Sequence, residues 1–175
     1  MSNYSLQIAL MVHGVSFSGK TYQEKPLGGS ESSAILMAEE LVRLGQEVSV
    51  FSYGDEESYG NQMRVDYNGV RYLRLPEMWQ STLATEDFDV FLVERDHNKL
   101  VDSLIRSRQL GLLNHDICSN GEALMANLYN CDFVYCLSEF HREQYEGKAP
   151  ELKGKIQLLG NPIDVERLQL IRDTL

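Results

Sequence analysis

The 175-residue sequence predicts a doubly wound α/β fold, in which helices cover both faces of a mostly parallel sheet. Three observations lead to this prediction. Near-continuous apolar runs, such as 6–12 and 89–93, suit strands that are buried on both faces. Helix-like segments alternate with these runs, which is the order of βαβ units. One β-hairpin is also expected at about residues 63–75, because the turn dipeptide Asn68-Gly69 lies between two strand-like segments.

The first βαβ unit can be followed along the chain. A strand at 6–12 leads into a loop at 13–29, and Ser30 is expected to cap the helix that follows. Gly45 ends this helix as a C′ glycine, and 48–51 form the next strand. Apolar side chains repeat at helical spacing between these ends, at Ala34, Met37, Ala38, Leu41 and Leu44.

The alternation continues after the hairpin. Strands are expected at 89–93, 110–114, 133–137 and 156–159, and helices at 100–107, 120–129 and 138–145. No internal repeat or composition shift divides the chain, so one domain is expected. Ligands of doubly wound sheets bind at the carboxyl ends of the strands, which directs attention to the polar residues that follow each strand.

Composition and charge narrow the function classes. A formal net charge of -10 argues against a nucleic-acid binder and against docking on an anionic membrane. No apolar run approaches the roughly 20 residues that cross a bilayer, so no transmembrane segment is expected. The three cysteines include no C-x-x-C pair, so no metal site is expected, and reduced thiols suggest a cytoplasmic protein.

Two segments compete as a phosphate site. Gly14–Thr21 matches the phosphate-loop pattern G-x-x-x-x-G-K-[ST], which would make the protein an NTPase or kinase. Pro26 and the glycines after it leave little more than one helical turn, although a working phosphate loop opens a full helix. Gly28-Gly29 instead precede a complete helix, whose N-terminal N–H groups attract anions. The glycine pair is therefore the better candidate, and the NTPase stays as the alternative.

Three segments carry a resemblance to a known family. They are G-G-S-E at 28–31 with its helix and G-Q-E-V at 45–48, then Val134–His141, then Lys155–Asp164. In this order they resemble the N-terminal, acceptor-side domain of family-four retaining glycosyltransferases, which have the GT-B fold; Gln46 replaces the family's usual histidine.

The resemblance implies how the chain is divided. It implies a Rossmann-like domain over residues 1–164 and the start of an interdomain linker or helix at 165–175. The family's C-terminal, donor-binding domain is expected to be absent from this chain and to be supplied in cis or by a separate subunit. The chain alone is then expected to be inactive.

The same resemblance, together with the strand ends, suggests site residues. Gly28, Gly29 and Ser30 are expected to face the donor diphosphate, and the catalytic candidates at the transferred sugar are His115 and Asp116. Possible acceptor-binding residues end two other strands, namely His13, Glu94, Arg95 and His97. Each also has a structural explanation as a turn glycine or a solvated polar loop. Trp79, in an expected loop, either stacks on a sugar or fills a hydrophobic space.

The implied reaction is transfer of a sugar from a nucleotide-diphosphate sugar to a hydroxyl of an acceptor glycan or small molecule. The family needs no cofactor or metal for this step, because dipoles and basic side chains stabilise the leaving diphosphate. A non-catalytic module that binds a glycan or a protein through the same cleft is the second alternative. Neither the donor nor the acceptor can be named from the sequence.

Overall fold

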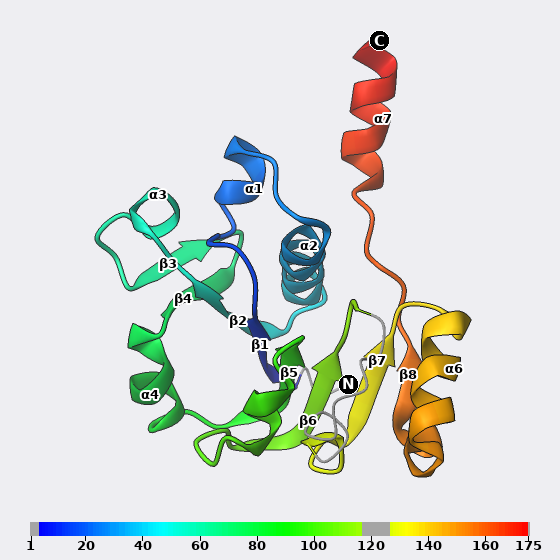
Figure 1. The fold of residues 1–175 in the computed structure, drawn as a ribbon. Helices are drawn as coiled ribbons and strands as arrows, with labels where there is room; N and C mark the ends of the chain where they lie inside the picture. The colour runs from blue at the N-terminus through cyan, green and yellow to red at the C-terminus, as the bar shows by residue number, and fades with distance from the viewer. Residues whose placement is uncertain (1–3, 117–126, 175) are drawn as a thin grey trace.

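A computed structural model describes residues 4–116 and 127–174, and within them the chain forms one eight-stranded sheet flanked by helices (Figure 1). The strand order is β3-β4-β2-β1-β5-β6-β7-β8, and every neighbouring pair is parallel except β3 and β4. The predicted doubly wound α/β class is confirmed. The strands are β1 Gln7–Val12, β2 Glu47–Tyr53, β3 Arg64–Tyr67, β4 Val70–Leu75, β5 Phe88–Glu94, β6 Ser107–Leu113, β7 Phe133–Cys136 and β8 Ile156–Leu158.

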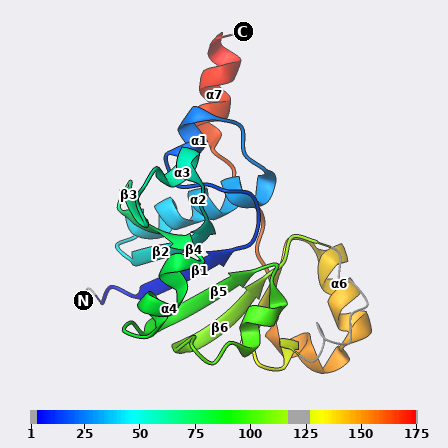
Figure 2. The same ribbon diagram turned by 60° about the vertical axis from the view of Figure 1, so that its left-hand side comes forward.

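Helices cover both faces of this sheet (Figure 2). Alternation along β1 explains why, since Ile8, Leu10 and Val12 join the core beneath α2, whereas Ala9 and Met11 join the core beneath α4 and α6. The helices are α1 Thr21–Glu24, α2 Gly29–Arg43, α3 Glu56–Tyr59, α4 Glu77–Leu83, α6 Glu139–Lys148 and α7 Val165–Thr174, with 3₁₀ turns η1 His97–Val101 and η2 Pro150–Lys155.

The direction of the winding reverses at β1. The chain moves from β1 to β2 and β4 on one side, and later from β1's other edge to β5, β6, β7 and β8. The carboxyl ends of β1 and β5 therefore flank the topological switch point, where doubly wound sheets bind their ligands. His13 follows β1, and Glu94 ends β5.

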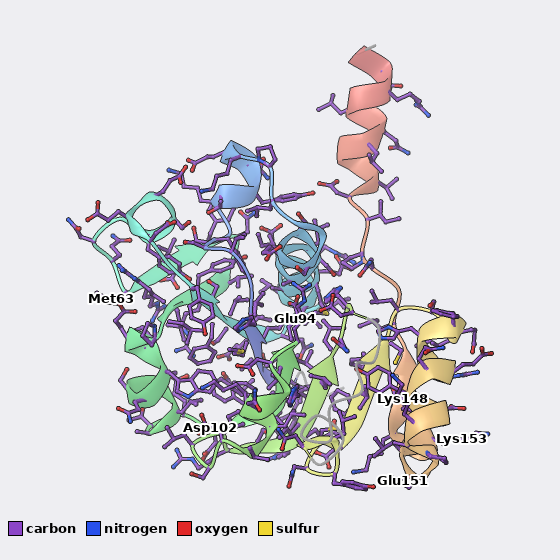
Figure 3. The ribbon with its side chains drawn as sticks, viewed as in Figure 1. Met63, Glu94, Asp102, Lys148, Glu151 and Lys153 are labelled. Carbon is purple, nitrogen blue, oxygen red and sulfur yellow. The ribbon has the colours of Figure 1, made fainter. Side chains whose placement is uncertain are left out.

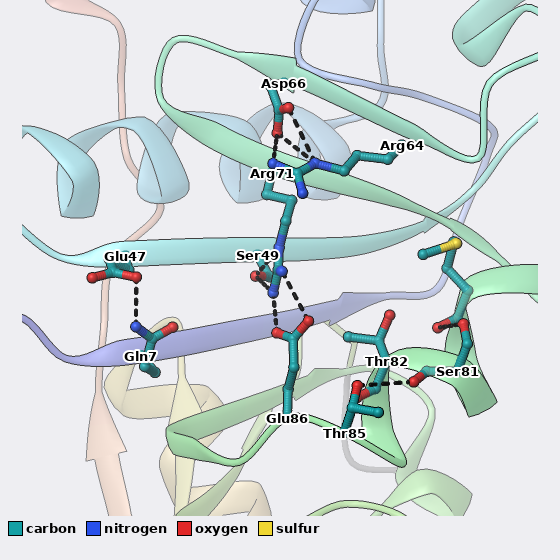
Figure 4. Close-up of polar contacts among 11 residues, drawn as sticks. Gln7, Glu47, Ser49, Arg64, Asp66, Arg71, Ser81, Thr82, Thr85 and Glu86 are labelled. Carbon is teal, nitrogen blue, oxygen red and sulfur yellow. Dashed lines mark hydrogen bonds and ion pairs between the residues drawn. The ribbon is translucent and has the colours of Figure 1, made fainter.

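The amino-terminal edge of the sheet holds its charges in pairs. Arg71 on β4 donates to Ser49 Oγ on β2 at 2.7 and 3.0 Å and forms a two-armed pair with Glu86 (Figure 4). On β3, Arg64 donates to Asp66. These contacts give the charged side chains hydrogen-bond partners, so we assign these residues a structural role rather than a role in the candidate site.

The predicted hairpin at about 63–75 is confirmed as β3 and β4, with Asn68 and Gly69 both at positive φ. Gly45, at φ 87°, ends α2 as expected. Ser138 caps α6, where its Oγ accepts from the His141 N–H at 3.2 Å. Most of the helix expected at 120–129 lies outside the described residues.

Three local predictions are wrong. The cap of α2 is Gly28 rather than Ser30, since Ser30 lies inside the first turn and its hydroxyl donates to Glu31. The segment 100–107 is not a helix, because the Asp102 side chain accepts from the Leu104 N–H and turns the chain so that Ser107 already pairs with β5. The expected loop around Trp79 is helix α4, which packs against the sheet.

Candidate functional site

The candidate site lies at the switch point, and its first component is the N-terminal turn of α2. Gly28 has extended backbone, with φ -64° and ψ 162°, and no side chain caps the helix among the described residues. A Cβ added at Gly29 would meet no atom within 4 Å. The first-turn N–H groups have no partner one turn earlier, so this turn presents open donors and the positive end of a 15-residue helix.

Glu31 holds this turn against the loop that follows β1. Its side chain is buried, and its Oε1 accepts the Val15 N–H at 3.1 Å. The carboxylate fills the space beside Gly14 and Gly28, where an added Cβ at either position would overlap its oxygens. A methyl group at either position would have to displace the Glu31 carboxylate, whereas Gly29 has open space around it.

Arg95 places a positive charge beside the open turn. It follows β5 with a left-handed backbone, φ 65°, and its guanidinium donates to both Asp116 oxygens at 2.9 and 3.1 Å. One guanidinium nitrogen also lies 3.4 Å from Ser30 Oγ. The Arg95 hydrogen bonds hold the pKa of the Asp116 carboxyl below its ordinary value. Residues from β5, β6 and α2 thus meet around one cation.

Glu94 ends β5 directly before Arg95, and its side chain is labelled in Figure 3. The side chain is 3% exposed, and its Oε1 lies 3.2 Å from His115 Nε2, whose side chain is 9% exposed. This contact lacks the alignment of a directed hydrogen bond, and among the described residues neither Glu94 oxygen has another partner. Burial raises the pKa of Glu94; the His115 imidazole opposes this rise and the Glu31 charge adds to it.

His141 and Asn114 support the β6 end of the site. His141, at the N-terminus of α6, is buried, and desolvation lowers its pKa. Asn114 donates to the Asp116 carbonyl at 3.2 Å and to the Tyr145 hydroxyl of α6. These contacts fix the turn that carries His115 and Asp116, so α6 positions this turn without contributing a side chain to the open turn.

Most of the sequence-predicted site residues meet at this edge. Gly28, Gly29, Ser30, Arg95 and Asp116 form its open part, and Glu94 and His115 form its buried part. His13 lies apart from both, with Nδ1 3.9 Å from Asp96 Oδ2 and its ring edge-on to Tyr53. His97 is also outside the cluster, and its Nδ1 lies 3.1 Å from the Asn127 amide nitrogen.

The contribution of Glu31 was missed by sequence reasoning. The G-G-S-E motif contains the signal, because a glutamate in the first turn of a helix suits the helix dipole. Its burial between two glycine-containing segments depends on tertiary packing. The same holds for the Glu94–His115 contact, which joins two strand ends that are 21 positions apart in the chain.

The phosphate-loop match has a different structure from a phosphate site. Several of its N–H groups donate within the protein, from Val15 to Glu31, from Phe17 to the Tyr53 carbonyl and from Ser18 to Thr21 Oγ1. The helix α1 that follows has only four residues. Lys20 pairs with Glu24 at 3.0 Å on the surface. This geometry argues against the NTPase alternative.

Residues 4–116 and 127–174 contain no group of three or more His, Cys, Asp or Glu side chains placed to hold a metal ion. No helix in these ranges is both long and apolar enough to cross a membrane. Cys131 and Cys136 are buried cysteines, and Cys118 lies outside the described residues.

Two solved structures are similar to this chain over 95% of its length. One is sucrose-phosphate synthase from Thermosynechococcus elongatus, with a TM-score of 0.55 and 15% identity over 95% of that chain. The other is an α-glucosyltransferase in complex with UDP and a 13-mer DNA containing a central A:G mismatch, with a TM-score of 0.55 and 14% identity. This chain covers 44% of the α-glucosyltransferase. Neither a family model nor a curated protein sequence matches the chain. At these identities the likeness concerns the fold, and the chain has the fold of a Rossmann-like GT-B domain.

Proposed function

We propose that this chain is the acceptor-side domain of a retaining glycosyltransferase, which moves a sugar from a nucleotide-diphosphate sugar to an acceptor hydroxyl. The observation that carries the proposal is the open first turn of α2 at the switch point, with Arg95 held beside it. The GT-B fold and the two similar glycosyltransferases support it. In this proposal residues 1–164 form the domain, and 165–175 lead toward the donor-binding half, in cis or on a separate subunit.

The donor diphosphate would bind at Gly29 and Ser30. Open N–H groups and the helix dipole stabilise a phosphate there, and the Arg95 guanidinium adds a charge-assisted donor. Asp116 keeps Arg95 in place before the ligand arrives and releases one or both hydrogen bonds when a phosphate competes. This arrangement stabilises the charge that develops on the leaving diphosphate, which is the main requirement of such a transfer.

His115 would act at the transferred sugar. Its Nε2 faces Glu94, so Nδ1 is the nitrogen that remains for a sugar hydroxyl. Glu94 then serves as a positioning residue, because its carboxyl group, 3.2 Å from Nε2, favours the ring orientation that keeps this nitrogen inward. No metal or other cofactor takes part in the proposed step, and the nucleotide sugar is a substrate.

The test is UDP binding to this chain, measured by isothermal titration calorimetry with Arg95→Ala beside the wild type. We expect the variant to lose about tenfold in affinity, since a hydrogen bond to a charged group contributes about 1.5–3 kcal/mol. Arg64→Ala is the matched control, because Arg64 is an exposed arginine on β3, the outermost strand on the β2 side of the sheet, and pairs there with Asp66. Equal affinities for the wild type and Arg95→Ala would refute the assignment of the diphosphate site.

Catalysis needs a separate assay. Residues 1–175 alone are expected to transfer no sugar from UDP-glucose or other nucleotide sugars to any acceptor, because the donor-binding half is required. Addition of that half, fused or as a second polypeptide, should produce transfer with retained anomeric configuration, followed by NMR of the product. Robust transfer by this chain alone, or an inverted product, would contradict the proposal. Binding of a glycan without transfer in the complete protein would favour the binding-module alternative.

A further inference from the structure

A cavity lies at the same edge of the sheet as the candidate site, on the face opposite α2. Its volume is about 420 Å³, and it is enclosed by the carboxyl ends of β1, β2 and β4, by α4 and by the segment after β5. Met11 and Leu75 line its floor, and Trp79 lines its wall. We call it the Trp79 pocket. None of the acceptor candidates predicted from the sequence lines it.

The polar groups of the Trp79 pocket are arranged around Lys99. Its Nζ lies 4.8 Å from the centroid of the Trp79 ring and 3.6 Å from Asp102 Oδ2. The Trp79 indole N–H donates to the same Asp102 oxygen at 3.0 Å. Gln80, exposed on α4, contributes an amide to the lining. The pocket therefore offers an ammonium donor, a carboxylate acceptor and an amide with both functions, beside aromatic and aliphatic surface.

The charges of the lining cancel. Lys99 pairs with Asp102, and Glu77, the remaining charged group of the lining, lies 3.6 Å from Arg74. A ligand with a net charge would therefore find no excess of opposite charge there. A neutral ligand that combines hydroxyl groups with an apolar ring face fits this lining, and a sugar ring has both features.

The pocket lies next to His13, the residue that follows β1. Tyr53 ends β2 and lines the pocket, and its ring meets the His13 ring edge-on at 5.5 Å between centroids. His13 in turn follows β1 at the switch point and reaches toward Asp96. A molecule in the Trp79 pocket that contacts Tyr53 would therefore lie near His13.

We propose that the Trp79 pocket binds a neutral sugar, the acceptor of the transfer reaction. The role of this sugar as the acceptor rests on the proposed function, whereas the binding of a sugar does not depend on it. Lys99 and Asp102 hydrogen-bond the ring hydroxyls, Gln80 recognises a further hydroxyl at the rim, and Tyr53 contacts the apolar face of the ring. His13 lies where the reacting hydroxyl leaves the pocket.

Trp79 makes the test direct, because it is the single tryptophan of the chain. The protein is titrated with the methyl glycosides of glucose, galactose and mannose at millimolar concentrations, with Trp79 emission as the signal. We expect at least one glycoside to change the emission saturably, and glucose 6-phosphate to have no effect. Gln80→Ala, an exposed substitution, should weaken the response at least threefold. Lys99→Ala should weaken it further. Arg64→Ala should leave it unchanged.

The outcomes separate this proposal from the proposed function. No saturable response to any of the three glycosides, or a stronger response to glucose 6-phosphate, overturns the neutral-sugar site. A response that Gln80→Ala and Lys99→Ala leave unchanged also overturns it. UDP binding, measured on the same samples, is expected to be equal in the wild type and in both pocket variants. If a glycoside binds but UDP does not, the diphosphate site is refuted and the sugar site is retained.

Discussion

The loop Gly14–Thr21 and the turn Gly28–Glu31 both place glycines at the same edge of the sheet, but they use their backbone N–H groups differently. In the loop, the N–H groups of Val15, Phe17 and Ser18 donate within the protein. In the turn, the helix start is uncapped by any described side chain and Gly29 faces open space. A phosphate site requires donors that the protein itself does not satisfy. The letters of a motif are therefore weaker evidence than the partners of its N–H groups.

The largest expected effect tests whether the loop and the turn are packed as one unit. In Gly14→Ala the new methyl group would overlap the Glu31 carboxylate, so we expect a loss of about 2–3 kcal/mol in the free energy of unfolding. Urea denaturation measures this. Gly29→Ala, which meets no atom, should change stability by less than about 0.5 kcal/mol. Equal losses in the two variants would show that Glu31 does not join the segments.

The second effect concerns ligand binding at the turn. Gly29→Val fills the open space in front of the first-turn N–H groups, so UDP affinity should fall about tenfold, or about 1.4 kcal/mol, with stability nearly unchanged. Calorimetric titration measures the affinity, and Gly154→Val, at another glycine with open space, serves as the control. Wild-type affinity in Gly29→Val would place the anion elsewhere.

A smaller effect follows from the buried carboxyl beneath the turn. Because burial raises the folded-state pKa of Glu94 above the ordinary value of 4.5, Glu94 stabilises the fold while it is protonated. This stability is lost as the pH rises from about 4.5 through the folded-state pKa. Wild type should therefore lose stability relative to Glu94→Gln over this range, in urea denaturation at a series of pH values. If the difference in stability between the two proteins is independent of pH, burial does not raise the pKa of Glu94 in the folded state.

The smallest effect is expected in the loop. Lys20 and Glu24 form an exposed pair, so Lys20→Ala should change stability by less than about 0.5 kcal/mol and leave nucleotide affinity unchanged with or without magnesium. Fluorescence titration with a labelled ATP measures this, with Gly29→Val as the comparison. Magnesium-dependent ATP binding that Lys20→Ala abolishes would reverse the assignment and restore the NTPase alternative.

Apolar runs and one turn dipeptide were sufficient to predict the sheet. The hairpin at Asn68-Gly69 and the end of α2 at Gly45 follow local backbone preferences, which is why they were predictable. Helix α4 was not, because it has seven residues and follows a proline, and its place is determined by Trp79 packing on Phe51 and Phe91. The early start of β6 depends on pairing with β5, which no local pattern reveals.

The candidate site was also predictable only in part: the strand-end residues followed from the sequence, but their contacts did not. Polar residues at strand ends, such as Arg95 and Asp116, could be assigned to one edge of the sheet, because parallel strands end at a common edge. The pairing of Glu94 with His115 and the packing of Glu31 between two glycines arise from tertiary contacts. The Trp79 pocket belongs to this second class, since its walls come from four separate parts of the chain.

The central position of β1 has a consequence for how this chain folds. Strand β1 pairs with residues 47–52 on one side and with residues 90–94 on the other, both later in the chain. It therefore cannot complete its hydrogen bonds until at least half of the domain has left the ribosome, and such non-local pairing slows folding. Until then its apolar edges are exposed to other chains. The switch point therefore also leaves β1 without its full set of strand partners during synthesis.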